Sequence, residues 1–330
     1  MLRIALDGLG GESVASESAK ALPAYLEERK DVSVLLATDE ANFASLLGSL
    51  SPSAGKRLHW LEAPEKILDD EQPVRALKRK PRSSIRVAVE ALAAGKADAL
   101  VSFGHTGATT AAAQLYLGNL PGVERAGIAV LLPGRPRGCL LMDVGANADC
   151  KPIHLQHYAL LAETYCQSAL KIDSPRIGLL NLGQEAGKGD AILKRAFDLL
   201  QGSVEHFVGN IEGDQLFDGS VDIAIAPGII GNIVLKACES LAGKLFSALR
   251  EEFRGEEAVL RTLASVASRH DPDSHGASRL LGTRGLVLIG HGKARSAAIQ
   301  GALRSAEAEI RLGLQPMLLT KLASLTHTES

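Results

Sequence analysis

The sequence predicts an α/β protein: a three-layer α/β/α sandwich in which helices cover both faces of a mostly parallel sheet. Short apolar runs alternate with longer amphipathic segments along the 330 residues. The chain is aliphatic, with 4% aromatic residues, and its 33 glycines exceed the usual share of about 7%. Glycine at that level is typical of tight turns between strands and helices. No internal repeat or low-complexity tract interrupts the pattern, so we expect residues 1–330 to form a single domain.

The predicted strands are short apolar runs bounded by polar or glycine-containing turns. In chain order they cover residues 2–6, 32–37, 58–61, 97–102, 127–132, 138–143, 176–182, 207–209, 221–225 and 286–289. Most of these runs are apolar at successive positions, as strands buried on both faces are. The runs at 127–132 and 138–143 flank Pro133-Gly-Arg-Pro136, which is typical of a hairpin turn.

The predicted helices are the longer segments with apolar residues at helical spacing. They cover residues 13–28, 41–50, 84–94, 107–117, 152–170, 190–200, 231–253 and 294–312. The basic stretch 64–84 is interpreted as a loop or an exposed helix. Two apolar faces in about 241–275 predict a helical protrusion. Its tip, residues 250–257, carries four glutamates against two arginines.

Composition excludes several classes of protein. Lys and Arg total 36 against 38 Asp and Glu, a net charge of −2, which gives no basic footprint for non-specific nucleic-acid binding. The four cysteines form no C-x-x-C pair, which favours reduced thiols in a cytoplasmic protein over disulfides or a zinc site. We expect no signal peptide and no transmembrane helix. Peripheral membrane contact stays open.

The turns that follow the predicted strands carry the functional signal, because ligands of such folds bind beyond the carboxyl ends of strands. Glycine lets the backbone approach a ligand closely, and the next helix offers free N–H groups to an anion. We expect seven such turns to meet at one edge of the sheet. They are 7–11, 104–107, 143–149, 181–189, 209–212, 227–232 and 291–292.

Three individual motifs have simpler interpretations. The turn 7–11 lacks the spacing of a dinucleotide-binding fingerprint. The loop 183–188 has three residues between its glycines, and Gly189 stands where a magnesium-binding Ser or Thr would be, so it is not an ATPase loop. His154 and His157 share one helix face without further ligands, which argues against a metal.

In combination, the motifs resemble those of the bacterial phosphate acyltransferases of the PlsX type, from about residue 2 to 312. The series, in chain order, is Asp7-x-x-Gly10-Gly11, Pro73-x-Arg75-Ala76, Ser83-Ser84, Ser102-x-Gly104-x-Thr106-Gly107-Ala108, Asp143-x-Gly145-Ala146-Asn147-x-Asp149, Asn181-x-Gly183-x-Glu185, Lys188-Gly189, Gly209-Asn210-x-Glu212, Gly228-x-x-Gly231-Asn232, Gly276-Ala277, Leu281-Gly282 and His291-Gly292.

The resemblance implies a function and an environment. The family transfers a long-chain acyl group from acyl carrier protein to inorganic phosphate, giving acyl phosphate for phospholipid synthesis. Its fold is similar to that of phosphotransacetylase and of isocitrate-dehydrogenase-like enzymes. The family works as a homodimer at the cytoplasmic face of the membrane, and it needs no metal and no organic cofactor.

Specific residues then acquire expected roles. A phosphate dianion needs a cation, for which Lys188 in its glycine-flanked loop is the candidate. The thioester oxyanion needs a donor, for which Asn232 is the candidate. Arg75 and Arg79 are expected to contact the acidic carrier protein. The remaining expected substrate-binding residues are Asp7, Gly10, Gly11, His105, Thr106, Gly107, Asp143, Asn147, Asn181, Glu185, Gly231 and His291.

The chain also departs from the family pattern. His105 stands where the family has Asn, and Pro227 stands where it has Asp. Loss of such partners leaves two alternatives open: a short-chain or coenzyme A-dependent phosphate acyltransferase, and a non-catalytic relative that binds phosphate. The acidic tip lacks the Lys and Arg of strong interfacial helices, so we expect weak membrane contact, and packing of these helices on a second copy is the competing interpretation.

Overall fold

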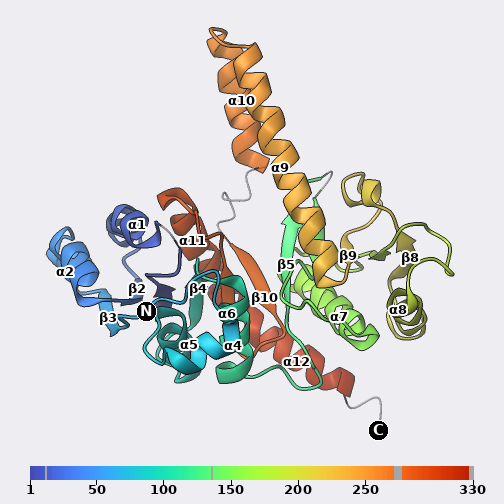
Figure 1. Cartoon of the computed structure of the whole chain (residues 1–330), viewed down its shortest axis with the longest axis horizontal. Coiled ribbons are helices and arrows are strands. Elements are labelled where there is room, and N and C mark those ends of the chain that lie inside the picture. The colour runs from blue at the N-terminus through green and yellow to red at the C-terminus, as the bar shows by residue number, and fades with distance from the viewer. Residues whose placement is uncertain (12, 135–136, 271–276, 327–330) are drawn as a thin grey trace.

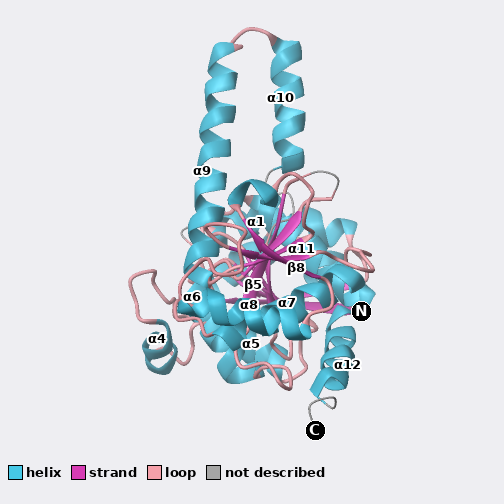
Figure 2. Ribbon diagram, turned by 90° about the vertical axis from the view of Figure 1, so that its right-hand side faces the viewer, coloured by secondary structure: helices cyan, strands magenta, loops and turns pink. Residues whose placement is uncertain are grey.

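The computed structural model describes residues 1–11, 13–134, 137–270 and 277–326. The strands form a single sheet in the order β3-β2-β1-β4-β11-β10-β5-β6-β9-β7-β8, with helices on both faces (Figures 1 and 2). The strands are β1 (Leu2–Asp7), β2 (Val32–Thr38), β3 (Leu58–Glu62), β4 (Ala99–Ser102), β5 (Gly127–Leu132), β6 (Cys139–Met142), β7 (Ile177–Leu180), β8 (Phe207–Ile211), β9 (Ile223–Ile225), β10 (Ser278–Leu281) and β11 (Leu286–Ile289).

The helices follow the predicted order, with additions at places where the sequence pattern is weak. They are α1 (Val14–Glu28), α2 (Glu40–Gly48), α3 (Pro52–Gly55), α4 (Pro73–Arg79), α5 (Ser84–Ala93), α6 (Thr106–Ala112), α7 (Pro152–Ser168), α8 (Ala191–Ser203), α9 (Gly228–Glu252), α10 (Glu257–His270), α11 (Ser296–Leu312) and α12 (Leu314–Thr326). Helix α6 continues as a π-helical turn over Ala113–Leu117. The basic stretch contains α4, so the exposed-helix interpretation is the correct one there.

Two apolar layers sandwich the sheet, which confirms the predicted α/β/α architecture. Side chains alternate between them along each strand: Ile4 and Leu6 of β1 pack in one layer, and Ala5 packs in the other. The first layer lies under α1, α7, α8 and α11, and the second lies under α5, α6 and the start of α9. The period of two in a strand therefore explains why runs such as 286–289 are apolar throughout.

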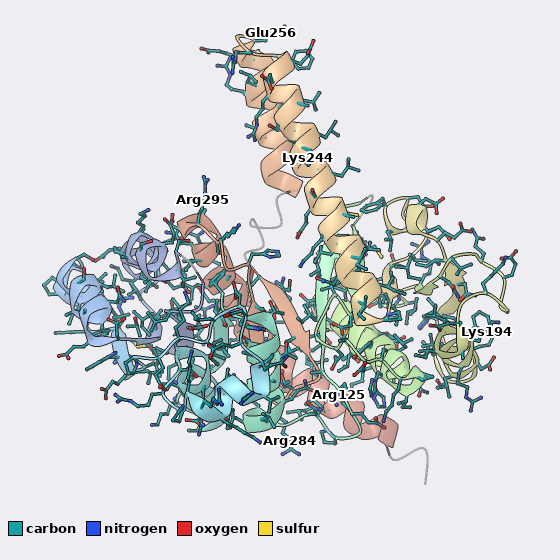
Figure 3. All side chains as sticks on the ribbon, viewed as in Figure 1. Arg125, Lys194, Lys244, Glu256, Arg284 and Arg295 are labelled. Carbon is teal, nitrogen blue, oxygen red and sulfur yellow. The ribbon has the colours of Figure 1, made fainter. Side chains whose placement is uncertain are left out.

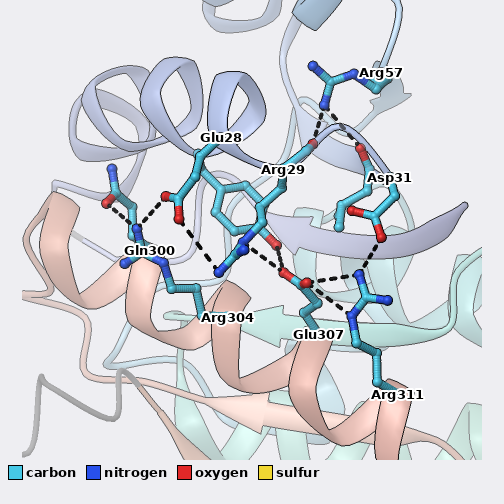
Figure 4. A network of polar contacts seen from close by, with 10 residues as sticks. Glu28, Arg29, Asp31, Arg57, Gln300, Arg304, Glu307 and Arg311 are labelled. Atoms are coloured by element: carbon cyan, nitrogen blue, oxygen red, sulfur yellow. Dashed lines mark hydrogen bonds and ion pairs between the residues drawn. The ribbon is translucent and has the colours of Figure 1, made fainter.

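Polar contacts add to the packing between α1 and α11 (Figure 4). Arg304 Nη2 lies 2.9 Å from Glu28 Oε2, and Arg29 Nε lies 3.3 Å from Glu307 Oε2. Tyr25 is buried and donates to Glu307 across 3.4 Å. These contacts join the first helix of the chain to a helix nearly 300 residues later.

The sheet reverses direction partway across, and this overturns one prediction. Strands β3, β2, β1, β4 and β11 are parallel, whereas β10 is antiparallel to both β11 and β5. Strand β6 is antiparallel to β5 and parallel to β9, and β9, β7 and β8 continue in that direction. The carboxyl ends of β6–β9 therefore lie at the opposite edge of the sheet from those of β1, β4 and β11.

The prediction that seven turns meet at one edge is therefore wrong. We call the edge at the carboxyl ends of β1, β4 and β11 the His105 edge, and the edge at the carboxyl ends of β6, β7, β8 and β9 the Lys188 edge. Strand β5, six residues long, spans about 20 Å between them. The reversal occurs at the antiparallel pair of β5 and β6, the hairpin that the sequence predicts, whereas β10 is antiparallel to both of its neighbours and leaves β5 running in the same direction as β11. Strand β10 was not identified from the sequence.

Helices α9 and α10 project from the body as an antiparallel pair (Figures 1 and 2). Lys244 lies partway along the projecting part of α9, and Glu256 lies at the tip (Figure 3). Helix α9 starts at Gly228, three residues before the predicted start. Residues 271–275 of the predicted protrusion, and residues 135–136 of the predicted hairpin turn, lie outside the described residues.

Candidate active site

At the His105 edge, Asp7 ends β1 with a fully buried carboxylate. Its Oδ2 accepts a hydrogen bond from Ser102 Oγ at 2.8 Å, and its Oδ1 accepts from the backbone N–H of Leu9 at 3.4 Å. Burial raises the pKa of Asp7, and hydrogen bonds from Ser84 and Ser102 oppose that rise. Because both oxygens of this carboxylate accept hydrogen bonds from the protein itself, Asp7 holds the turns of β1 and β4 together.

Glycines at this edge let three turns pack backbone to backbone. A Cβ on Gly10 would lie 2.4 Å from Asp7 Oδ2 and 2.5 Å from the Gly104 nitrogen. A Cβ on Gly11 would lie 2.2 Å from the carbonyl oxygen of Gly292. These glycines are thus required by the contact of the β1, β4 and β11 turns with one another.

The N-terminus of α6 presents His105, Thr106 and Gly107. His105 caps the helix, because its Nδ1 accepts from the backbone N–H of Ala108 at 3.3 Å. Thr106 is exposed, and Gly107 lies against Pro73 at the start of α4. The basic helix α4 therefore lies next to this helix N-terminus.

Helix α4 carries a concentration of positive charge. Arg75, Lys78 and Arg79 are exposed, and none of the three forms an ion pair with a residue that the structure describes. Their neighbours Lys80 and Arg82 are instead paired with Glu71 and Glu62, respectively. A basic surface with unpaired cations is suited to an acidic partner.

His291 follows β11 at the same edge and contacts the middle of α9. Its Nε2 lies 3.3 Å from Glu239 Oε1. Lys66 adds a cation here, and its Nζ donates to the carbonyl oxygen of Gly11 at 2.5 Å. The His105 edge thus collects Asp7, Gly10, Gly11, His105, Thr106, Gly107 and His291 of the predicted residues.

At the Lys188 edge, Asp143 organises the turn after β6. Its Oδ1 accepts from the backbone N–H groups of Ile128, Gly145 and Ala146 at 3.0, 3.1 and 2.9 Å. Its Oδ2 accepts from the backbone N–H of Asn147 at 3.0 Å. Burial raises the pKa of Asp143 while these hydrogen bonds oppose the rise. Asp143 therefore fixes the shape of its turn.

Asn147 ties that turn to α7. Its Nδ2 donates to the carbonyl oxygen of Ala126 at 2.7 Å and to the hydroxyl of Tyr158 at 2.8 Å. Tyr158 is fully buried and was not identified from the sequence. It lies inside a helix rather than after a strand, so the strand-end rule could not find it.

The N-terminus of α9 packs directly on the Asp143 turn. A Cβ on Gly231 would lie 2.0 Å from the Asp143 carbonyl oxygen, and a Cβ on Gly228 would lie 2.3 Å from the Asn147 carbonyl oxygen. A Cβ on Gly145 would come within 3.3 Å of Asn232 Cβ. Asn232, the fifth residue of α9, therefore stands half-buried beside the Asp143 turn.

The Lys188 loop is held by two asparagines. Asn181 Nδ2 donates to the Lys188 carbonyl oxygen at 3.2 Å and to Asn210 Oδ1 at 3.1 Å. Asn210 Nδ2 donates to the Glu185 carbonyl oxygen at 2.8 Å. Asn210 belonged to a predicted motif but was not assigned to the site. Lys188 Nζ lies 3.8 Å from Glu185 Oε1, and the lysine side chain is 45% exposed.

The Asp143 turn and the Lys188 loop follow β6 and β7, the two strands that flank β9 in the sheet. Burial, together with the charges of Asp143 and Asp190, raises the pKa of the Cys150 thiol to about 12. Asp190 caps α8 directly after the Lys188 loop. One edge thus brings together a cation, the half-buried Asn232 amide near the start of α9 and glycine-rich backbone, which can bind a phosphate and donate to an oxyanion.

Neither edge has the features of a metal centre or a membrane span. Among the residues that the structure describes, no three His, Cys, Asp or Glu side chains gather as metal ligands. His154 instead binds within the protein, with its Nε2 3.2 Å from Glu124 Oε2. No helix in the described ranges is long and apolar enough to cross a bilayer.

Solved structures with a similar fold include members of two groups of enzymes. The EutD phosphotransacetylase from Staphylococcus aureus matches with a TM-score of 0.57 and 16% identity, covering 93% of this chain and 94% of that one. The 4-hydroxythreonine-4-phosphate dehydrogenase from Klebsiella pneumoniae matches with a TM-score of 0.55 and 14% identity, covering 94% and 99%. At these identities the likeness shows the fold, which is the one expected.

Relatives found by sequence similarity identify the family, whereas the solved structures show the fold alone. The family model described as fatty acid synthesis protein matches residues 2–317. The phosphate acyltransferase of Desulforamulus reducens is 36% identical over 324 residues, covering 96% of each chain. That of Thermus thermophilus is 39% identical over 337 residues, covering 98% of this chain and 99% of its own. With its fold, its glycine-rich strand ends and this similarity over nearly its full length, the chain belongs to the phosphate acyltransferase family.

Proposed function

We propose that this enzyme transfers a long-chain acyl group from acyl carrier protein to inorganic phosphate, giving acyl phosphate for phospholipid synthesis. The observation that carries the proposal is the Lys188 edge, where a lysine in a glycine-rich loop and an asparagine, the fifth residue of α9, lie at the same edge of the sheet. Membership of the phosphate acyltransferase family supports the reaction. The unpaired cations of α4 support an acidic protein as the acyl donor.

In the proposed mechanism, phosphate itself is the nucleophile. Lys188 Nζ holds the dianion, and Glu185, 3.8 Å away, limits the lysine's motion until phosphate replaces it as the partner. A phosphate oxygen attacks the thioester carbonyl carbon, and Asn232 donates to the oxyanion that forms. Collapse of this intermediate breaks the C–S bond, and the leaving thiolate then takes up a proton to become the carrier-protein thiol.

The other predicted residues act through these two in the proposal. Asp143 and Asn147 hold the turn on which α9 begins, and Asn181 holds the Lys188 loop. Asp7 and the glycines of the His105 edge hold the turns from which Thr106 and His105 project. The proposed setting is a cytoplasmic homodimer with weak peripheral contact to the inner membrane, since the tip of the helical pair is net acidic.

A test of this function compares two lysines of the same edge. Acyl phosphate made from palmitoyl carrier protein and phosphate is trapped with hydroxylamine and measured as hydroxamate. We expect Lys188→Ala to lower kcat/KM by about a hundredfold, which corresponds to about 2.7 kcal/mol of lost transition-state stabilisation. The control is Lys194→Ala, because Lys194 is exposed on α8 and outside the loop. Equal activity of the two variants would refute the role of Lys188.

The same assay separates the remaining alternatives. A short-chain phosphate acyltransferase would use acetyl coenzyme A and leave palmitoyl carrier protein intact. A non-catalytic relative would bind phosphate and turn over neither donor. The short-chain alternative is tested because phosphotransacetylases share the fold. The non-catalytic alternative is tested because His105 and Pro227 depart from the family pattern.

A further inference from the structure

The first residues of β5 bring an arginine to the Lys188 edge. Strand β5 is antiparallel to β6, so its start lies beside the Asp143 turn, which follows β6. The backbone N–H of Ile128 donates to Asp143 Oδ1 at 3.0 Å, and the carbonyl oxygen of Ala126 accepts from Asn147 Nδ2 at 2.7 Å. Arg125, the residue before Ala126, is therefore at this edge.

Figure 3 shows the same separation of the two edges. Arg125 lies at one end of the sheet, and Arg295, which follows β11 at the His105 edge, lies at the other, on the side of the projecting helical pair. Arg125 is thus far from the basic helix α4, to which we assign the carrier protein, and belongs with the residues to which we assign phosphate.

The backbone on either side of Arg125 is held by hydrogen bonds. The backbone N–H of Glu124 donates to His157 Nδ1 at 3.4 Å, and the Glu124 carbonyl oxygen accepts from Asn119 Nδ2 at 2.9 Å. The Ala126 carbonyl oxygen is held by the asparagine of the Asp143 turn. These contacts fix the point from which the Arg125 side chain leaves the backbone.

The Arg125 side chain, in contrast, is exposed, and it forms no ion pair with a residue that the structure describes. The adjacent carboxylate is engaged elsewhere, because Glu124 Oε2 lies 3.2 Å from His154 Nε2 and 3.8 Å from Lys151 Nζ. Burial raises the pKa of Tyr158, and the charge of Arg125 opposes that rise, so the guanidinium is within electrostatic range of the Tyr158 hydroxyl. A cation without a carboxylate partner is available to an anionic ligand.

Lys188 alone does not balance the charge around it. Its Nζ lies 3.8 Å from Glu185 Oε1, and the charges of Asp143 and Asp190 both act on the Cys150 thiol at this edge. A phosphate dianion would add further negative charge beside these three carboxyl groups. An arginine is suited to compensate it, since the planar guanidinium donates two parallel hydrogen bonds to phosphate.

Arg125 and Lys188 approach the Asp143 turn from opposite sides. The strand order β5-β6-β9-β7 separates the start of β5 from the loop after β7 by three strand spacings, about 14 Å. Each of the two side chains contains five or six bonds of about 1.5 Å and so reaches about 6–7 Å from its Cα. The ammonium and the guanidinium can therefore meet the same anion above the Asp143 turn and the start of α9.

We propose that Arg125 binds the acceptor phosphate together with Lys188, with one cation on either side of the Asp143 turn. The guanidinium donates to two phosphate oxygens, which leaves another oxygen to attack the thioester carbon. The backbone N–H groups at the start of α9 face the same anion. The use of this anion as acyl acceptor rests on the proposed function, whereas its binding by Arg125 does not.

Steady-state kinetics test the assignment by separating the two substrates. We expect Arg125→Ala to raise KM for phosphate about thirtyfold, which corresponds to about 2 kcal/mol, because a hydrogen-bonded charge pair is lost. KM for the carrier protein should stay unchanged. Arg125→Lys should recover part of the loss, since it restores the charge but not the paired donors. Arg195→Ala is the matched control, because Arg195 is exposed on α8, and it should behave as the wild type.

Two kinetic results would overturn the proposal. One is a KM for phosphate in Arg125→Ala equal to that of Arg195→Ala. The other is a rise in KM for the carrier protein with KM for phosphate unchanged, which would place Arg125 on the side of the acyl donor.

A binding measurement keeps the test independent of turnover. Phosphate that binds the folded protein raises its unfolding temperature, by an amount that grows with the ratio of its concentration to Kd. With no acyl donor present, and against KCl of equal ionic strength, we expect phosphate to stabilise the wild type and Arg195→Ala more than Arg125→Ala. Each shift is measured against the same variant without phosphate, so a change in basal stability does not enter the comparison.

The binding outcomes distinguish the phosphate site from the proposed reaction. Equal shifts in Arg125→Ala and Arg195→Ala, or no shift in the wild type, would overturn the role of Arg125. An Arg125-dependent shift in a protein that makes acyl phosphate from no donor would support the phosphate site and refute the proposed function.

Discussion

Two glycines of α9 allow one substitution to be compared in two environments. Gly243 has no atom within 4 Å of a Cβ placed on it, whereas a Cβ on Gly231 would lie 2.0 Å from the Asp143 carbonyl oxygen and 3.0 Å from its carbonyl carbon. Alanine in a helix interior is more favourable than glycine by about 1 kcal/mol. We therefore expect Gly243→Ala to stabilise the protein by up to about 1 kcal/mol.

At Gly231 the same gain is outweighed by overlap. The Asp143 backbone is held by the four N–H groups bound to its own side chain, so the helix rather than the turn must move, by more than 1 Å. Overpacking of this kind costs about 1–3 kcal/mol or more. We expect Gly231→Ala to lower the free energy of unfolding by about 2 kcal/mol, and to lower kcat because Asn232 moves with the helix.

Urea unfolding followed by circular dichroism measures both variants against the wild type. The matched pair separates helix propensity, which is common to both, from contact with the Asp143 turn, which only Gly231 makes. If Gly231→Ala were as stable as Gly243→Ala, α9 would not be seated on the turn, and the description of the Lys188 edge would fail.

Four further outcomes are expected. Arg75→Glu with Arg79→Glu should raise KM for the carrier protein about tenfold with kcat unchanged, and an unaltered KM would remove α4 from the docking surface. Tyr158→Phe should lose about 1 kcal/mol of stability with its hydrogen bond to Asn147, measured by urea unfolding; an unchanged midpoint would show that this bond contributes nothing. Hydrogen bonding to Arg304 lowers the pKa of Glu28 in the folded protein. The stability that this contact contributes is therefore present above the pKa of Glu28 in the unfolded chain, and it is lost as the pH falls through the folded pKa. Glu28→Gln should flatten the fall in the unfolding midpoint between pH 7 and about pH 3, and an equally steep fall in the variant would contradict this. Flotation with anionic vesicles should recover little protein, and tight binding would contradict the inference from the acidic tip.

Local sequence patterns were sufficient to predict most of the helices and strands. Apolar runs such as 2–6 and 32–37 became β1 and β2 within one residue, because a buried strand needs apolar side chains on both faces. The importance of the turn glycines could also be predicted from the sequence. Gly10, Gly11 and Gly231 lie where any side chain would overlap a neighbouring backbone. The atoms that those glycines contact could not be predicted, because they belong to other turns that are distant in the sequence.

The arrangement of the candidate site was beyond the sequence for a different reason. Strand β10 reads Ser-Arg-Leu-Leu, and its Arg279 is accommodated only because Glu309 of α11 lies 2.6 Å away. No local pattern reveals such a strand, and its antiparallel pairing with both β11 and β5 sets the direction of β5, and so of the β5–β6 hairpin, relative to β1, β4 and β11.

The sequence by itself determined the α/β class, the family and the residues that we propose for binding phosphate and thioester, because these depend on short-range patterns. The tertiary structure alone decided which turns share an edge and that Tyr158 supports Asn147. Those features depend on strand direction and on contacts between distant segments, which are set by the packing of the whole chain.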